Sequence, residues 1–222
     1  MRNVRLLAAL GLVAMAGAAH AEVTGTAAIV SDYDYRGISQ TQKDPAVQLS
    51  IDYAHESGFY AGTWGSNVDF GTPDPSTEVD LYTGFKFAAG DVGFDVGGVY
   101  YAYPSASDLN FWEVYGKASW SILSGGVYYS SDFGATDEAG TYVYADLGIP
   151  AGPVTIGLHA GLSDGDAIEA LFGDNSYKDY SIGVSYSASN ITLGLKWVTA
   201  DFASGSDDRV ILSIGTALPW GQ

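Results

Sequence analysis

Carboxylate side chains recur at even spacing along strand-like stretches of this sequence, and they are the groups whose type and spacing could do chemistry. Glu78 and Asp80 flank Val79, and Asp52 and Asp95 also alternate with apolar neighbours. Because successive side chains of a β-strand point to opposite faces, these acids share one face and the apolar residues occupy the other. A face with an excess of carboxylates attracts cations and repels anions.

The same parity places a larger set of polar side chains on this inner row. Its members are Asp52, Asp69, Glu78, Asp80, Lys86, Asp95, Glu113, Lys117, Asp146, His159, Asp179 and Lys196. Asp32, Asp34 and Arg36 extend the row along the first strand, close to an outer mouth. Acids outnumber bases in both groups, so a cylinder lined by this row would favour cations, as acidic rings do in channels.

His159 and Ser163 come nearest to a hydrolase base and nucleophile. They stand four residues apart on one row of a strand, which separates them by roughly 13 Å. A nucleophile and its base must approach to about 3 Å. His55 falls in a tight turn beside Glu56, and no Gly-x-Ser-x-Gly elbow occurs. We therefore expect no catalytic residue, no enzyme activity and no cofactor.

Twelve segments with a period close to two would have to position these side chains. They lie near 23–35, 46–55, 59–70, 77–88, 92–103, 110–121, 125–133, 140–149, 153–163, 178–187, 190–200 and 209–220. Most match the length of about 9–11 residues that a tilted membrane strand needs. Soluble strands are usually about five or six residues long. The segment at 125–133 alternates least regularly.

The connections between the segments alternate in length. Short ones fall at 55–58, 88–91, 121–125, 150–152 and 187–190, and longer polar ones at 36–45, 71–76, 104–108, 134–139, 164–177 and 201–208. Short turns at one end and long loops at the other are typical of outer-membrane barrels. Hydrocarbon offers no partner for backbone polar groups, so a spanning sheet must close. The sequence therefore predicts an all-β fold, a 12-stranded antiparallel transmembrane β-barrel.

Aromatic residues on the apolar rows gather near the ends of these segments. The expected girdle consists of Tyr53, Tyr60, Phe70, Phe87, Tyr100, Trp112, Trp120, Tyr180, Tyr186, Trp197 and Trp220. Val, Leu, Ile, Ala and Gly fill the centres of the same rows. Aromatic rings at both headgroup levels with aliphatic side chains between them are typical of membrane barrels.

Residues 1–21 have the three-part pattern of a cleaved signal peptide. Arg2 and Arg5 precede an apolar stretch, and Ala19-His20-Ala21 is a small-x-small cleavage signal. The domain that remains is expected to span residues 22–222. The chain has a net charge of −17 and no cysteine. This acidity excludes nucleic acid as a partner, and the lack of thiols excludes cysteine catalysis and cysteine-ligated metals.

Alternatives to an open membrane channel stay open at this point. A soluble all-β protein would turn its apolar rows inward, and a membrane barrel could be filled by its own side chains. Carboxylates also gather in the predicted loops, at Asp74, Asp108, Asp137, Glu138, Asp164, Asp166, Glu169, Asp174, Asp201, Asp207 and Asp208. Such loops can bind divalent cations, so a non-conducting structural or adhesive barrel that binds cations, lipopolysaccharide or a partner is the second hypothesis. Asp164-Gly165-Asp166 lacks the rest of a calcium loop, so no resident metal is expected.

Three stretches carry a resemblance to a known family. They are residues 31–41 (SDYDYRGISQT), 52–70 (DYAHESGFYAGTWGSNVDF) and 78–85 (EVDLYTGF). The chain resembles the TorF porin family of small proteobacterial outer-membrane proteins. The resemblance implies a location in the bacterial outer membrane, assembly by the barrel assembly machinery, contact with lipid and lipopolysaccharide, and passage of a small solute or ion. Barrels of this kind commonly end on an aromatic residue, whereas here Gly221 and Gln222 follow Trp220.

Overall fold

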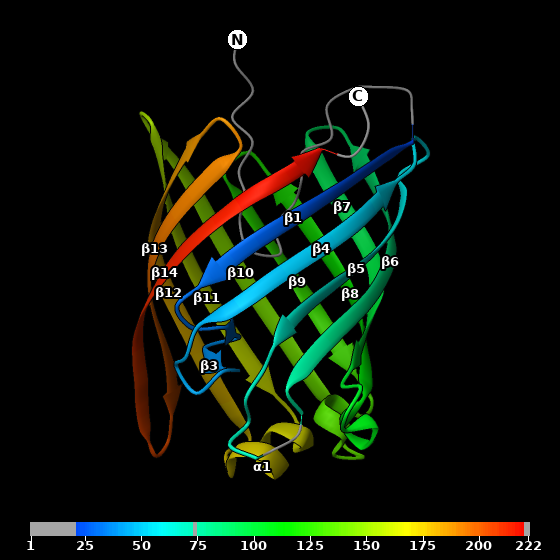
Figure 1. Ribbon diagram of the computed structural model, residues 1–222. Coiled ribbons are helices and arrows are strands. Elements are labelled where there is room, and N and C mark those ends of the chain that lie inside the picture. Colours follow the sequence, from blue (N-terminus) through cyan, green and yellow to red (C-terminus); the bar gives the residue numbers. More distant parts are fainter. Residues whose placement is uncertain (1–20, 73–74, 220–222) are drawn as a thin grey trace.

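The computed structural model describes residues 21–72 and 75–219, and within them twelve strands form one closed antiparallel barrel (Figure 1). The barrel strands are β1 (Glu22–Val30), β4 (Ala46–Ala54), β5 (Phe59–Asn67), β6 (Thr77–Ala89), β7 (Val92–Ala102), β8 (Phe111–Trp120), β9 (Leu123–Ser130), β10 (Gly140–Ala151), β11 (Val154–Asp164), β12 (Ser176–Ala188), β13 (Ile191–Phe202) and β14 (Gly205–Pro219). The predicted number of strands and the antiparallel barrel are confirmed.

The first and last strands close the sheet. β1 pairs with β14 from Thr24↔Pro219 to Val30↔Ser213, and on its other side with β4 from Glu22↔Ala54 to Val30↔Ala46. Every barrel strand therefore has two neighbours, and the sheet leaves no open edge. This closure satisfies the backbone groups that a bilayer could not.

Apolar side chains cover the outside of the barrel. On β4, Val47, Leu49 and Ile51 are exposed, whereas the alternating Gln48 and Ser50 are partly buried. The period of two that appears in the sequence thus separates an apolar outer wall from a polar interior. No helix in the described part of the chain is long and apolar enough to cross a bilayer.

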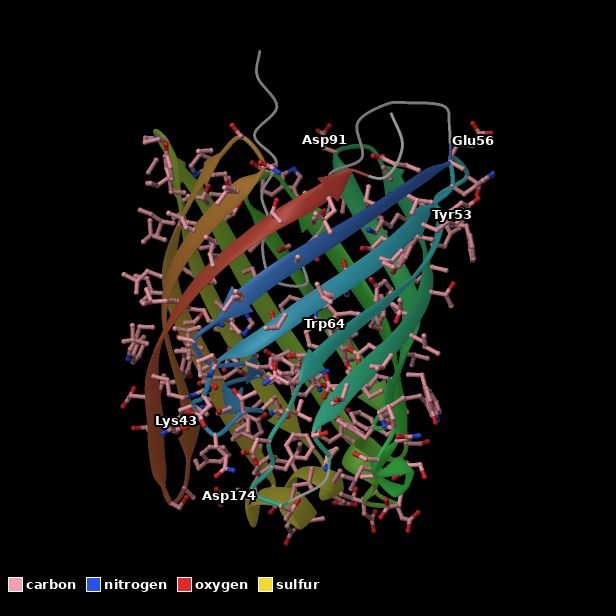
Figure 2. All side chains as sticks on the ribbon, viewed as in Figure 1. Lys43, Tyr53, Glu56, Trp64, Asp91 and Asp174 are labelled. Carbon is pink, nitrogen blue, oxygen red and sulfur yellow. The ribbon has the colours of Figure 1, made fainter. Side chains whose placement is uncertain are left out.

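The two ends of the barrel differ, and we call them the turn end and the loop end. Short connections join β4 to β5, β6 to β7, β8 to β9, β10 to β11 and β12 to β13 at the turn end, where β1 also begins and β14 ends. Figure 2 shows Glu56 and Asp91 at this end and Asp174 at the other. The loop end carries η1 (Ser107–Leu109), η2 (Phe133–Ala135) and α1 (Asp166–Phe172).

The structure corrects two of the expected boundaries. The predicted loop 201–208 is wrong, because β13 and β14 stay paired to Phe202↔Gly205 and extend as a hairpin beyond their neighbours. The first strand does not run to residue 35 but ends at Val30. There the chain leaves the wall and folds into the barrel as β2 (Asp34–Tyr35) and β3 (Ile38–Ser39).

Buried aromatic and aliphatic side chains fill the barrel near the loop end. One cluster contains Tyr101, Tyr103, Phe111, Phe133, Ala167, Ile168, Tyr177 and Ala200, and a smaller one contains Tyr33, Ala46 and Val68. Tyr35 and Ile38 of the inward segment pack against the first cluster. The inward segment is therefore packed against buried side chains of the barrel interior. The predicted signal peptide, apart from Ala21, and the girdle residue Trp220 lie outside the described residues.

Candidate functional site

Residues 31–45 form the central feature of the lumen, and we call them the inward hairpin. β2 and β3 pair through Asp34↔Ser39 and Tyr35↔Ile38, with Arg36 and Gly37 as the two turn residues. Both turn residues have positive φ angles, 51° and 81°. A two-residue turn with two positive φ angles matches the twist of its strands and favours Asn-Gly. The arginine in this turn is therefore a departure from the usual preference.

Arg209 on β14 anchors one side of the inward hairpin. Its Nη1 donates to Oδ2 of Asp32 at 2.5 Å, and its Nη2 donates to Oδ1 of Asp34 at 2.6 Å and to the Gly37 carbonyl at 2.5 Å. Lys196 on β13 adds a contact from Nζ to Oδ2 of Asp34 at 2.8 Å. The guanidinium of Arg209 is buried, so these contacts compensate charges that have left water.

Arg36 carries the hairpin to the opposite wall. Its Nη2 lies 2.6 Å from Oε2 of Glu113 on β8, and the two side chains are 7% and 0% exposed. Burial lowers the pKa of Arg36, but the neighbouring Glu113, Tyr35 and Tyr101 together outweigh that effect and hold the pKa above its ordinary value. Arg36 therefore remains protonated beside Glu113.

Four aromatic rings surround the guanidinium of Arg36. Its central carbon lies 4.4 Å from the ring centre of Tyr142, 4.7 Å from Tyr35, 5.0 Å from Tyr128 and 5.4 Å from Phe133. All four distances fall within the range of cation–π attraction, about 6 Å. Glu113 and these four rings thus form a cation-binding cage, which the side chain of Arg36 occupies.

Other carboxylates lie close to this cage. Glu78 accepts hydrogen bonds from Tyr33 at 2.7 Å and Tyr103 at 2.8 Å, and Tyr101 donates to Glu113 at 2.9 Å. Asp80 is buried, and its Oδ1 has no hydrogen-bond partner among the described residues. No group of acids and histidines in the described ranges has the geometry of a metal site.

A second polar group lies on β10, β11 and β12. His159 contacts Asp146 through Nδ1 at 2.6 Å and Asp179 through Nε2 at 2.8 Å. Tyr142 lies 2.9 Å from the same Nε2. The imidazole is thereby fully engaged, and Ser163, which the sequence places on the same row, makes no contact with it. This arrangement is a hydrogen-bonded network and not a nucleophile–base pair.

The remaining predicted inner residues lie nearer the turn end. Asp52 accepts from Tyr82 at 2.5 Å, and Asp95 accepts from Tyr60 at 2.6 Å. Lys86 lies 4.6 Å from the ring centre of Tyr60, and Lys117 lies 4.1 Å from that of Tyr115. Tyrosine hydroxyls thus hold these acids in place, whereas the lysines rest on tyrosine rings.

Three expectations about single residues are corrected. Asp69 is exposed beyond the end of β5, where it accepts from Gln42 at 2.7 Å, because strand parity has no meaning past Asn67. Tyr60 does not belong to the girdle, since its hydroxyl reaches Asp95 inside the barrel while the preceding Phe59 is exposed. Asp32, Asp34 and Arg36 lie on the inward hairpin and not on the wall of the first strand, because Asp32 and Asp34 pair with Arg209 and Arg36 pairs with Glu113.

The other described girdle residues are exposed on the outside. Tyr53, Phe70, Phe87, Tyr100, Trp112, Trp120, Tyr180, Tyr186 and Trp197 are 38–58% exposed. Phe70 lies past the end of β5 and packs edge-on against Tyr103, with ring centres 5.7 Å apart. Its position is therefore on the loop end and not on a strand.

Arg209 is the functional residue that sequence reasoning missed. Val210 and Leu212 are outer residues of β14, so parity already puts Arg209 inside. The cage tyrosines Tyr128 and Tyr142 were not singled out either, although Tyr142 alternates with apolar residues of β10. The signal in the sequence is their position, because both tyrosines fall on the inner rows of β9 and β10.

Three solved structures with a similar fold carry porin titles. The structure titled "KdgM porin" aligns with a TM-score of 0.58 at 10% identity, covering 90% of this chain and 99% of that one. "KdgM porin in complex with disordered oligogalacturonate" gives 0.57 at 10% identity, with the same coverage. A NanC porin structure gives 0.53 at 11% identity, covering 90% and 100%. At these identities the likeness establishes the fold.

Comparison with curated proteins and with family models completes the assignment. None of the curated proteins matches the sequence. One family model does, over residues 14–210, which is most of the chain. The chain therefore belongs to the family described as "Bacterial protein of unknown function (Gcw_chp)".

Proposed function

We propose that this protein is a porin-like channel of the outer membrane in which the inward hairpin forms a constriction for small solutes. The single observation that supports this proposal is the course of residues 31–45, which leave the wall and cross the lumen between Arg209 and Glu113. A barrel of this size has an interior that a few residues can narrow. Between the constriction and the turn end, polar side chains line the inner wall of the barrel.

The charge of the interior supports a weak preference for cations. Arg36, Arg209 and Lys196 are each paired with acids of the hairpin or the wall. Asp52 and Asp95 have tyrosine hydroxyls as partners and contact no cation among the described residues. The surplus of carboxylates attracts cations and disfavours an acidic oligosaccharide such as the oligogalacturonate named for the KdgM complex.

Conductance in planar bilayers tests the proposal. Val30 and Ala46 are direct partners on β1 and β4, so replacing residues 31–45 by a short Asn-Gly turn leaves that ladder intact. The expected result is small discrete currents for the wild type and larger ones for the shortened barrel. No current from either protein, over several preparations with correctly folded barrels, would overturn the channel.

A second candidate function is a non-conducting barrel that binds ligands at its loop end. The observation that favours it is the packing of the inward hairpin against buried aromatic side chains. In that case the acidic loops would bind divalent cations, lipopolysaccharide or a partner protein. The shortened barrel separates the two candidates, because a barrel closed by the hairpin alone conducts once the hairpin is removed.

Location and partners form part of the same proposal. The apolar outer wall and the aromatic residues near the strand ends support contact with outer-membrane lipid, with the loop end outside the cell. Export by a signal peptide, insertion by the barrel assembly machinery, membership of the TorF porin family and the absence of catalysis are further expectations. Fractionation of cells into inner and outer membranes tests the location.

A further inference from the structure

We propose that the cage around Arg36 is a binding site for guanidinium-bearing solutes and that Arg36 occupies it as a tethered ligand. The inference rests on the proposed channel function and deepens it, since it names a class of permeant. The cage consists of Glu113, Tyr128, Phe133 and Tyr142, with Tyr35 of the hairpin as an additional ring.

Most of the cage belongs to the wall and not to the hairpin. Glu113 is on β8, Tyr128 on β9 and Tyr142 on β10, while Phe133 is in η2, which connects β9 to β10. These strands are consecutive neighbours in the barrel. The carboxylate and three rings therefore keep their positions when Arg36 is absent, and the site is built into the wall.

The backbone conformation of Arg36 indicates that an arginine is present here for its side-chain contacts and not for the turn. The residue has φ 51° at a turn where asparagine and glycine are favoured. A non-glycine residue in this region is uncommon, and its strain persists when surrounding contacts hold it. The turn itself does not need an arginine. We therefore attribute the compensation for this backbone strain to the contacts between the guanidinium and the cage.

The tether leaves part of the cage unused. Arg36 reaches Oε2 of Glu113 through Nη2, whereas Oε1 of Glu113 is buried and has no hydrogen-bond partner among the described residues. A guanidinium is a planar fork that can bind both oxygens of a carboxylate at once. A free guanidinium, unconstrained by the hairpin backbone, can satisfy both oxygens once the Arg36 side chain is removed from the cage.

The test uses Arg36→Asn, which empties the cage and suits the turn. Folded barrels in detergent are heated with methylguanidinium chloride or with sodium chloride at equal ionic strength, and the temperature of the folded-to-unfolded gel shift is measured. Methylguanidinium is expected to raise this temperature in R36N in a saturable way. It is expected to leave the wild type, whose cage is filled, and the double variant R36N/E113Q unchanged at the same concentrations.

Lys43→Asn is the matched control. Lys43 is a basic residue of the same hairpin, also at positive φ, but it is exposed and pairs with Asp207. Its variant should respond to methylguanidinium as the wild type does. If R36N does not fold without ligand, the yield of folded barrel on refolding in methylguanidinium against sodium chloride becomes the readout. No difference between the two salts, or an equal effect on R36N/E113Q, overturns the site.

Currents separate the site from the channel. In planar bilayers, methylguanidinium should block the sodium current of R36N and not that of R36N/E113Q. A temperature shift in R36N with no current from any variant keeps the site and overturns the channel. If the barrels conduct but methylguanidinium neither shifts the unfolding temperature of R36N nor blocks its sodium current, the channel is supported and the site is overturned.

Discussion

Arg209 and Glu113 lie on opposite walls of the barrel, and the inward hairpin is ion-paired to both. Between their strands stand β13, β12, β11, β10 and β9 on one side and β1, β4, β5, β6 and β7 on the other. Asp32 and Asp34 contact Arg209 while Arg36 contacts Glu113, so residues close in sequence join two walls. The hairpin is therefore a strut that joins two opposite walls of the barrel.

Removing Arg209 should release this strut. In Arg209→Met the buried carboxylate of Asp32 loses its ion-pair partner and Asp34 keeps only Lys196; breaking a buried pair in this way costs about 3–5 kcal/mol. The free energy of unfolding, measured by urea titration of the barrel in lipid vesicles, should fall by that amount. In Lys43→Met the lost pair is exposed, so a change of about 0–1 kcal/mol is expected. Equal losses in the two variants would contradict the anchoring role of Arg209.

Gly37→Ala should loosen the hairpin by crowding. A methyl group there would lie 2.7 Å from Cβ of Asp179 and 3.0 Å from Cβ of Ala200, at φ +81°. Gly152 in the turn between β10 and β11 also has positive φ, but nothing lies within 4 Å of the added atom. Gly37→Ala should therefore lose about 1–3 kcal/mol more than Gly152→Ala. Trypsin cleavage after Arg36, followed by mass spectrometry, should be faster in Gly37→Ala alone.

Leu81→Arg tests the outward face of the wall. Leu81 is 54% exposed on β6, and an arginine facing mid-membrane lipid costs about 2–4 kcal/mol. The matched change Leu171→Arg falls on the exposed side of α1 at the loop end and should alter stability by about 0.5 kcal/mol or less. Urea unfolding in vesicles measures both. A neutral Leu81→Arg would show that this face does not meet lipid.

Neutralising interior acids should lower the preference for cations. Asp52→Asn and Asp146→Asn remove charges from the inner wall while leaving side chains of similar size. Reversal potentials across a salt gradient should move toward the value for equal permeability of cation and anion. Asp91→Asn, in the turn between β6 and β7, is the control and should change the reversal potential less. An unchanged potential in both interior variants would contradict an acidic permeation path.

The wall of the barrel could be predicted from the sequence, because in each strand outward apolar side chains alternate with inward polar or small ones. Val47, Leu49 and Ile51 face out since period two fixes the face of every residue once one is known. The outer face predicted for Tyr60 is wrong although its alternation with Phe59 holds, because tyrosine is amphipathic and suits either face. The inward course of the hairpin could not be foreseen, since the partners of Asp32 and Arg36 lie 177 and 77 residues away in the chain.

The ion pairs of the strut also determine the stage of assembly at which the interior can become fixed. Asp32 follows β1, whereas its partner Arg209 lies on β14, the strand that completes the cylinder. A polypeptide that does not yet include β14 has the Asp32 carboxylate without its ion-pair partner Arg209. The hairpin therefore becomes fixed in the lumen only when β14 joins β1, so the narrowing of the interior is a by-product of barrel closure.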